Sequence, residues 1–136
     1  MGEKMDNKVR WLRISYWVGV IADALAALRM LFPEYIMRGS SPDVSYNIGM
    51  KWGVALMLGW TVLLIWADRK PLARKGVLLL TICPVIVGLM ITSVATFFAG
   101  IGTLASLIFN LILLSAIAIL MLFSYLNARG AETDAQ

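Results

Sequence analysis

Four long apolar stretches constrain this 136-residue chain more than any other feature. They cover residues 14–32, 46–67, 76–99 and 102–126, and about 20 residues at ~1.5 Å each cross a hydrocarbon core of roughly 30 Å. A span in lipid has to satisfy its backbone hydrogen bonds internally, as a helix does. The sequence therefore predicts an all-α polytopic membrane protein, a bundle of four transmembrane helices embedded in the lipid bilayer.

The four stretches take up most of the chain, and 60% of its residues are hydrophobic. No room is left beside them for a separate soluble domain. We expect one transmembrane domain over residues 14–126, a basic cytoplasmic segment at 1–13 and a cytoplasmic tail at 127–136. The first stretch contains charged residues, and no small-residue cleavage site follows it, so we expect a retained span rather than a signal peptide. Residues 131–136 are short and polar and are expected to be disordered.

The basic residues predict the orientation of the spans. Of the twelve Lys and Arg residues, nine fall on one side of the membrane and only Arg38 falls on the other. The nine are Lys4, Lys8, Arg10, Arg13, Arg69, Lys70, Arg74, Lys75 and Arg129. Positive residues stay in the cytoplasm, so both termini are expected there, in a multi-pass protein of the inner (plasma) membrane. The same bias argues against an antiparallel homodimer of oppositely inserted copies.

Two absences exclude several kinds of site. The chain has no histidine and a single cysteine, Cys83. A His/Cys zinc site, a histidine-ligated haem and a histidine general base are therefore excluded, and we expect no metal and no cofactor. No Ser-Lys or paired-carboxylate arrangement appears at helical spacing, so no catalytic residue is predicted. The basic residues flank the apolar stretches in short clusters, which does not indicate nucleic-acid binding.

Three ionisable residues, Asp23, Arg29 and Lys51, fall inside the predicted spans. A charge there costs at least about 2.5 kcal/mol, so each of them is a candidate functional residue. From the helical rise, Asp23 lies about 14 Å below the outer boundary, Lys51 about 8 Å and Asn110 about 12 Å. Compatible depths on the outer side predict a polar site that opens outward.

Helical spacing suggests which side chains could meet. We predict an ion pair between Asp23 and Lys51, with Asn110 hydrogen-bonding to it. Arg29 is about 120° around the helix from Asp23, so it is expected to extend to the outer interface. The ligand- or ion-binding candidates are Asp23, Lys51 and Asn110, with Arg29, Asn47, Thr92, Ser93 and Ser106 as secondary candidates. The alternative interpretation is a structural ion pair that only fixes helix packing.

Small residues and one proline predict how the helices pack. Gly49 and Gly53 form a GxxxG pair nearly opposite to Lys51, which suits contact within the subunit or between subunits. Gly88 is expected to let the third span approach a neighbour closely. Pro84 should kink that span or loosen it locally.

The loop at 67–76 reads Ala-Asp-Arg-Lys-Pro-Leu-Ala-Arg-Lys-Gly. It resembles the Asp-Arg…Arg-Lys loop after the second span of major-facilitator transporters, which implies a part in gating the cytoplasmic side. Here the spacing is longer and the glycine of that pattern is missing. The alternative is a topology anchor in which Arg69, Lys70, Arg74 and Lys75 contact anionic lipid.

Two further resemblances concern the whole layout. The stretch 56–88, with Leu-Gly-Trp-Thr at 58–61 and Trp-Ala-Asp-Arg-Lys-Pro at 66–71, resembles a group of small four-span prokaryotic membrane proteins with no assigned activity. Four spans with one acid in the first also resemble small multidrug-resistance transporters, although the Trp-Tyr and Gly patterns of that family are not evident.

Two functions remain open from the sequence. The first is a carrier or channel for a small solute or ion, which would have to be a homo-oligomer because four spans enclose little volume. The second is a non-catalytic accessory or assembly subunit that packs against a partner membrane subunit. An intramembrane enzyme is the least favoured.

Overall fold

The computed structural model describes residues 2–32, 44–100 and 102–133, and within them every regular element is helical. The first and second spans are α1 (Gly2–Leu31) and α2 (Val44–Asp68). The third is divided into α3 (Gly76–Leu80), the π-helix η2 (Thr81–Ile86) and α4 (Val87–Phe98), and the fourth is α5 (Leu104–Thr133). The prediction of an all-helical chain with four helices able to cross a bilayer is confirmed.

The first and last helices, α1 and α5, extend beyond the predicted spans. The basic segment joins the first span in α1 without a break, and α5 continues through residue 133. Helix growth from an existing helix fixes only one further residue per added hydrogen bond, which favours such extensions. The predicted disorder of the tail therefore does not hold for residues 131–133, and residues 134–136 lie outside the described part.

Pro84 disturbs the third span as predicted. It lies inside η2, where the backbone N–H of Val87 bonds to the carbonyl oxygen of Ile82, five residues earlier. A proline has no N–H to donate, and its ring displaces the preceding turn. The wider π-turn relieves that conflict without breaking the span.

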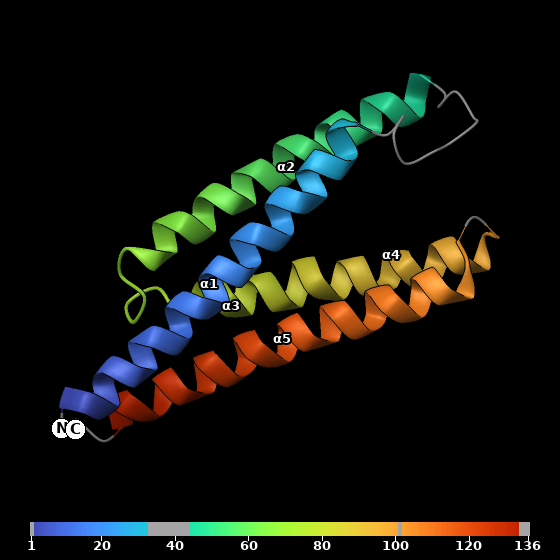
Figure 1. The fold of residues 1–136 in the computed structure, drawn as a ribbon. Coiled ribbons are helices and arrows are strands. Elements are labelled where there is room, and N and C mark those ends of the chain that lie inside the picture. Colours follow the sequence, from blue (N-terminus) through green and yellow to red (C-terminus); the bar gives the residue numbers. More distant parts are fainter. Residues whose placement is uncertain (1, 33–43, 101, 134–136) are drawn as a thin grey trace.

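The helices form two hairpins that diverge from a shared end (Figure 1). α1 lies against α2, α4 lies against α5, and α1 also contacts α5 near its own start. The start of α1 and the end of α5 lie together at the shared end, and the end of α4 and the start of α5 lie at the open end. Because the pairs separate toward the open end, the described helices form a splayed bundle.

The buried core lies at the shared end, which carries the basic clusters. Fully buried side chains come from every span: Leu12, Tyr16, Leu64, Leu78 and Met121. Away from this core, many large apolar side chains are exposed, as expected of helices that face lipid.

Polar contacts reinforce the packing of α1 against α5. The hydroxyls of Ser15 and Ser124 are 2.6 Å apart and fully buried. Ser124 Oγ also donates to the carbonyl oxygen of Trp11 at 3.2 Å. Trp11 in turn packs edge-on against Phe123, with ring centroids 5.6 Å apart.

The basic loop after α2 is held against the same end. Tyr16 donates its phenolic proton to the carbonyl oxygen of Arg74 at 2.9 Å. The Arg74 guanidinium lies 3.2 Å above the Trp66 ring and donates to the Trp66 carbonyl oxygen. Arg13 Nε lies 3.8 Å from Asp68 Oδ1. These contacts connect α1, α2 and the loop, while Arg69 and Lys70 stay exposed.

Candidate functional site

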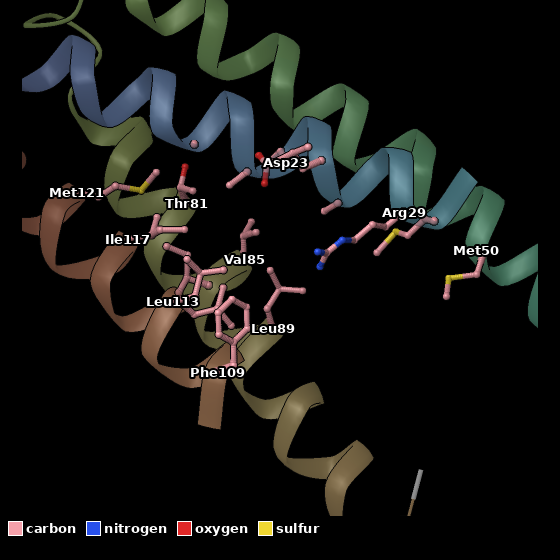
Figure 2. Close-up of a pocket in the computed structure, with 17 residues that line it drawn as sticks. Asp23, Arg29, Met50, Thr81, Val85, Leu89, Phe109, Leu113, Ile117 and Met121 are labelled. Atoms are coloured by element: carbon pink, nitrogen blue, oxygen red, sulfur yellow. The ribbon is translucent and has the colours of Figure 1, made fainter. Parts of the chain in front are cut away.

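A cleft of about 440 Å³ lies where the two hairpins separate (Figure 2). One wall is α1, which presents Gly19, Ala22 and Ala26. The opposite wall comes from η2, α4 and α5, and its side chains are almost all apolar. That wall consists of Thr81, Val85, Ile86, Leu89, Phe109, Leu113, Leu114, Ile117 and Met121. The site is thus an apolar space bordered by the small-residue face of α1.

Among the described residues that line this cleft, Asp23 carries the only carboxylate. The residue is 8% exposed, and its Oδ2 atom is buried without a hydrogen-bond partner. Figure 2 shows its side chain on the cleft side of α1, facing the wall formed by η2 and α5. A buried polar atom without a partner is costly, so this carboxylate can accept hydrogen bonds that the described chain does not supply.

Arg29 lines the same cleft, near its open end. Figure 2 shows its guanidinium nitrogens directed into the cleft from α1. The sequence placed this side chain at the outer interface, about 120° around the helix from Asp23. The structure places the exposed Arg29 side chain in the lining of the cleft, and its position relative to a membrane interface stays a prediction. The structure shows no ion pair between Arg29 and Asp23.

The expected ion pair between Asp23 and Lys51 does not form in the described structure. Lys51 is exposed on α2 and does not line the cleft. α2 turns its Gly53 face toward α1, since a Cβ at Gly53 would stand 3.0 Å from Met30 Sδ. Lys51 precedes Gly53 by two residues, which places it about 160° away around the helix. The close contact at Gly53 thus turns Lys51 away from α1.

The other glycines named from the sequence make no such contact. A Cβ at Gly49 or Gly88 would meet no atom within 4 Å. The close approach instead involves Gly19 of α1, where a Cβ would lie 2.8 Å from Met121 Cε and 2.9 Å from Leu64 Cδ1. Gly19 is therefore the position at which α1 meets α2 and α5 together.

Thr81 is a cleft residue that the sequence did not single out. Its hydroxyl donates to the Val77 carbonyl oxygen at 2.9 Å and accepts the Trp60 indole N–H at 3.1 Å. Because its proton is already used, Thr81 does not supply Asp23 with a donor. Its position at the start of η2, three residues before Pro84, is the signal that could have drawn attention to it.

Four of the predicted polar residues gather elsewhere, in a second pocket of about 140 Å³ between α4 and α5. They are Thr92, Ser93, Ser106 and Asn110, joined in the lining by Thr96, Phe97, Gly102, Thr103 and Leu107. The structure therefore divides the single predicted polar site into an Asp23 cleft and a separate hydroxyl-rich pocket. Asn47 belongs to the start of α2, but its side chain lies outside the described residues.

No group of three or more His, Cys, Asp or Glu residues that could hold a metal ion occurs in the part of the chain that the structure describes. Asp23 shares the cleft lining with Arg29 and Thr81, neither of which is a usual metal ligand, and Cys83 is exposed on η2. Comparisons with protein-family models, with curated proteins and with solved structures found no match to this chain, so its function has to be inferred from the cleft and the pocket themselves.

Proposed function

We propose that this chain is the subunit of an oligomeric carrier for a small solute, and that the Asp23 cleft is its binding site. The observation that carries the proposal is the buried Oδ2 atom of Asp23, which faces a cleft of about 440 Å³ without a hydrogen-bond partner. Sites for small molecules commonly have volumes of ~300–1,000 Å³, apolar walls and a few polar groups. The cleft has each of these properties.

The chemistry of the lining selects the class of solute. Apolar walls favour a largely apolar body, and a lone buried carboxylate favours a cationic group with an N–H or a compact positive charge. Arg29 near the open end discourages a second positive charge at that position. A small amphipathic cation fits this arrangement best.

A cleft that is open at one end and closed at the other suits a carrier better than a channel. The shared end is filled by Leu12, Tyr16 and Leu78 and held by the Tyr16–Arg74 contact. Alternating access needs such a closed side, and rocking of one hairpin against the other would exchange the two sides. In the orientation predicted from the basic residues, with both termini in the cytoplasm, the open end faces outward.

Binding of phenethylammonium, a small apolar cation with N–H donors, tests the proposal on the protein purified in mild detergent. Isothermal titration would compare the wild type with Asp23→Asn and with Lys51→Gln. Both substitutions neutralise one charge inside a span, but only Asp23 lines the cleft. We expect binding by the wild type and by Lys51→Gln, and loss of binding in Asp23→Asn.

Two results would contradict this assignment. Equal binding by all three proteins would show that the carboxylate takes no part. Loss of binding in Lys51→Gln as well would extend the site to Lys51, as an ion pair between subunits would require. Native mass spectrometry of the same samples reports whether the chain forms the homo-oligomer that a carrier of this size requires.

The small-residue face of α1 favours a second candidate function. Ala22 and Ala26 line the cleft about one helical turn apart, and transmembrane helix contacts are enriched in such small residues, whereas Gly19 is already packed against Leu64 and Met121. In this alternative the chain is an accessory subunit, and a helix of a larger complex occupies the cleft. A stoichiometric foreign subunit, retained by the wild type and by Asp23→Asn alike, would favour this function over the carrier.

A further inference from the structure

We propose that the pocket between α4 and α5 is a binding site for a monovalent cation such as Na⁺. The pocket lies at the open end of the second hairpin, beside the turn that joins α4 to α5. None of its lining residues lines the Asp23 cleft. The inference therefore does not rest on the proposed carrier function.

Four of the five hydroxyl groups that line this pocket, all but that of Thr103, have already used their protons. Thr92 and Ser93 both donate to the Leu89 carbonyl oxygen, at 2.9 Å and 2.8 Å. Thr96 donates to the Thr92 carbonyl oxygen at 2.7 Å, and Ser106 donates to that of Thr103 at 2.8 Å. A hydroxyl has one proton, so each of these four oxygens has only lone pairs left for a ligand.

Asn110 adds an acceptor without a competing partner. Its carboxamide lines the pocket, and no hydrogen bond to it is formed by the described residues. The amide can turn its oxygen inward, because the two ends of the group have nearly the same shape. The backbone N–H of Ser106 donates to Thr103 Oγ1 at 3.2 Å. This N–H at the start of α5 is therefore not free to donate to a ligand in the pocket.

A pocket lined by oxygen acceptors attracts a positive charge. The described residues of its lining include no Lys or Arg that would repel a cation, and no carboxylate. Divalent cations are strongly hydrated and are usually bound with carboxylate ligands, whereas neutral oxygens suffice for a monovalent ion. A volume of about 140 Å³ admits an ion with a few water molecules. The C-terminal end of α4 and the start of α5 both border the pocket, so their opposite partial charges largely cancel and the oxygen atoms alone select the ion.

Thermal unfolding of the full chain in mild detergent tests the site. Choline chloride would be replaced stepwise by NaCl or KCl at constant ionic strength, because the methyl groups of choline keep its charged nitrogen from the close contact with oxygen atoms that Na⁺ and K⁺ make. A bound ion stabilises the folded state by RT ln(1 + [L]/Kd), so the unfolding temperature rises with the logarithm of the ion concentration once that exceeds Kd. We expect such a rise with Na⁺ or K⁺ in the wild type and its loss when Thr96→Val and Asn110→Leu are combined.

Two variants keep this result specific. Thr61→Val is the matched control, because Thr61 donates to the Met57 carbonyl oxygen at 2.8 Å in the same way but lies outside the pocket. Thr96→Ser keeps the hydroxyl. Both should retain the response. If the double variant does not fold, Ser106→Ala takes its place, because Ser106 is exposed, and it should weaken the response. An unfolding temperature equal in choline, Na⁺ and K⁺ would overturn the proposal, as would a response that survives the double variant or disappears in Thr61→Val.

Discussion

At the scale of single residues, Asp23 is the position where stability and function favour different side chains. Its buried carboxylate has no partner for Oδ2, although the neighbouring positions of α1 are alanines. Replacing a buried unpaired polar group with an apolar group removes a desolvation penalty. If the side chain at position 23 served only to pack the helices, an acidic group there would bring no advantage.

The substitution Asp23→Leu should therefore stabilise the fold while removing the proposed binding site. We expect the free energy of unfolding to rise by about 1–3 kcal/mol, because the unpaired oxygen is lost and the open cleft accommodates the larger side chain. Reversible unfolding in mixed micelles measures this change. Asp23→Asn is the control, since it keeps an unpaired polar group and should give no such gain. A large loss of stability in Asp23→Leu would mean that the carboxylate has a structural partner.

The sequence identified Asp23 because a charge within an apolar stretch is conspicuous, and the same argument identified Lys51. It did not reveal that the two face different neighbours. Depth along a helix follows from counting residues, but rotation about its axis depends on which face packs. α2 carries small residues on one side and Lys51 on the other, and only the structure shows that the Gly53 side faces α1.

At the scale of helices, α1 organises the fold because it pairs with α2 in the first hairpin and also contacts α5 of the second. Gly19 lies at the level where both α2 and α5 approach α1 most closely. Gly19 is buried between Leu64 and Met121, both of which have no exposed surface. Without hydrophobic exclusion from water inside a bilayer, such close contacts supply much of the association energy between helices.

Gly19→Ala should weaken this junction, and Gly59→Ala should not. The new Cβ at position 19 would stand under 3 Å from two buried side-chain atoms, whereas at position 59 it meets nothing within 4 Å. Both changes raise helix propensity by a similar amount. The difference in stability between the two variants therefore reports the cost of packing the new Cβ at position 19. We expect Gly19→Ala to be less stable than Gly59→Ala by about 1–3 kcal/mol in the same unfolding assay. Equal stabilities would mean that Leu64 and Met121 move aside without cost.

The number of spans and the disturbance at Pro84 were predictable, because length, hydropathy and a missing N–H act locally. The gathering of Thr92, Ser93, Ser106 and Asn110 in one pocket was predictable only in part. A short turn between α4 and α5 brings their polar ends together, but the separation of this pocket from Asp23 depends on the spread of the hairpins.

At the scale of the whole molecule, the two hairpins share one packed end and diverge at the other (Figure 1). Local sequence patterns contain no signal for this divergence, because it results from many weak contacts between spans. If the protein is a carrier, the divergence is one of two states, and the contacts of Tyr16 and Arg74 hold the closed end. The Arg13–Asp68 ion pair is long at 3.8 Å and its arginine is exposed, so it adds little to that closure.

Distances between spin labels would show whether the hairpins move. Labels at Leu28→Cys and Ile112→Cys, in a Cys83→Ser background, report the open end, since both residues are exposed on opposite hairpins and neither lines the cleft. Labels at Arg69→Cys and Arg129→Cys report the shared end. Phenethylammonium should shorten the first distance and lengthen the second, because rocking about the bound cation closes one side as it opens the other. Asp23→Asn should abolish both changes. If the cation binds and neither distance changes, the cleft is a binding site that does not move. If only the distance at the open end shortens, the cleft closes over the cation without alternating access.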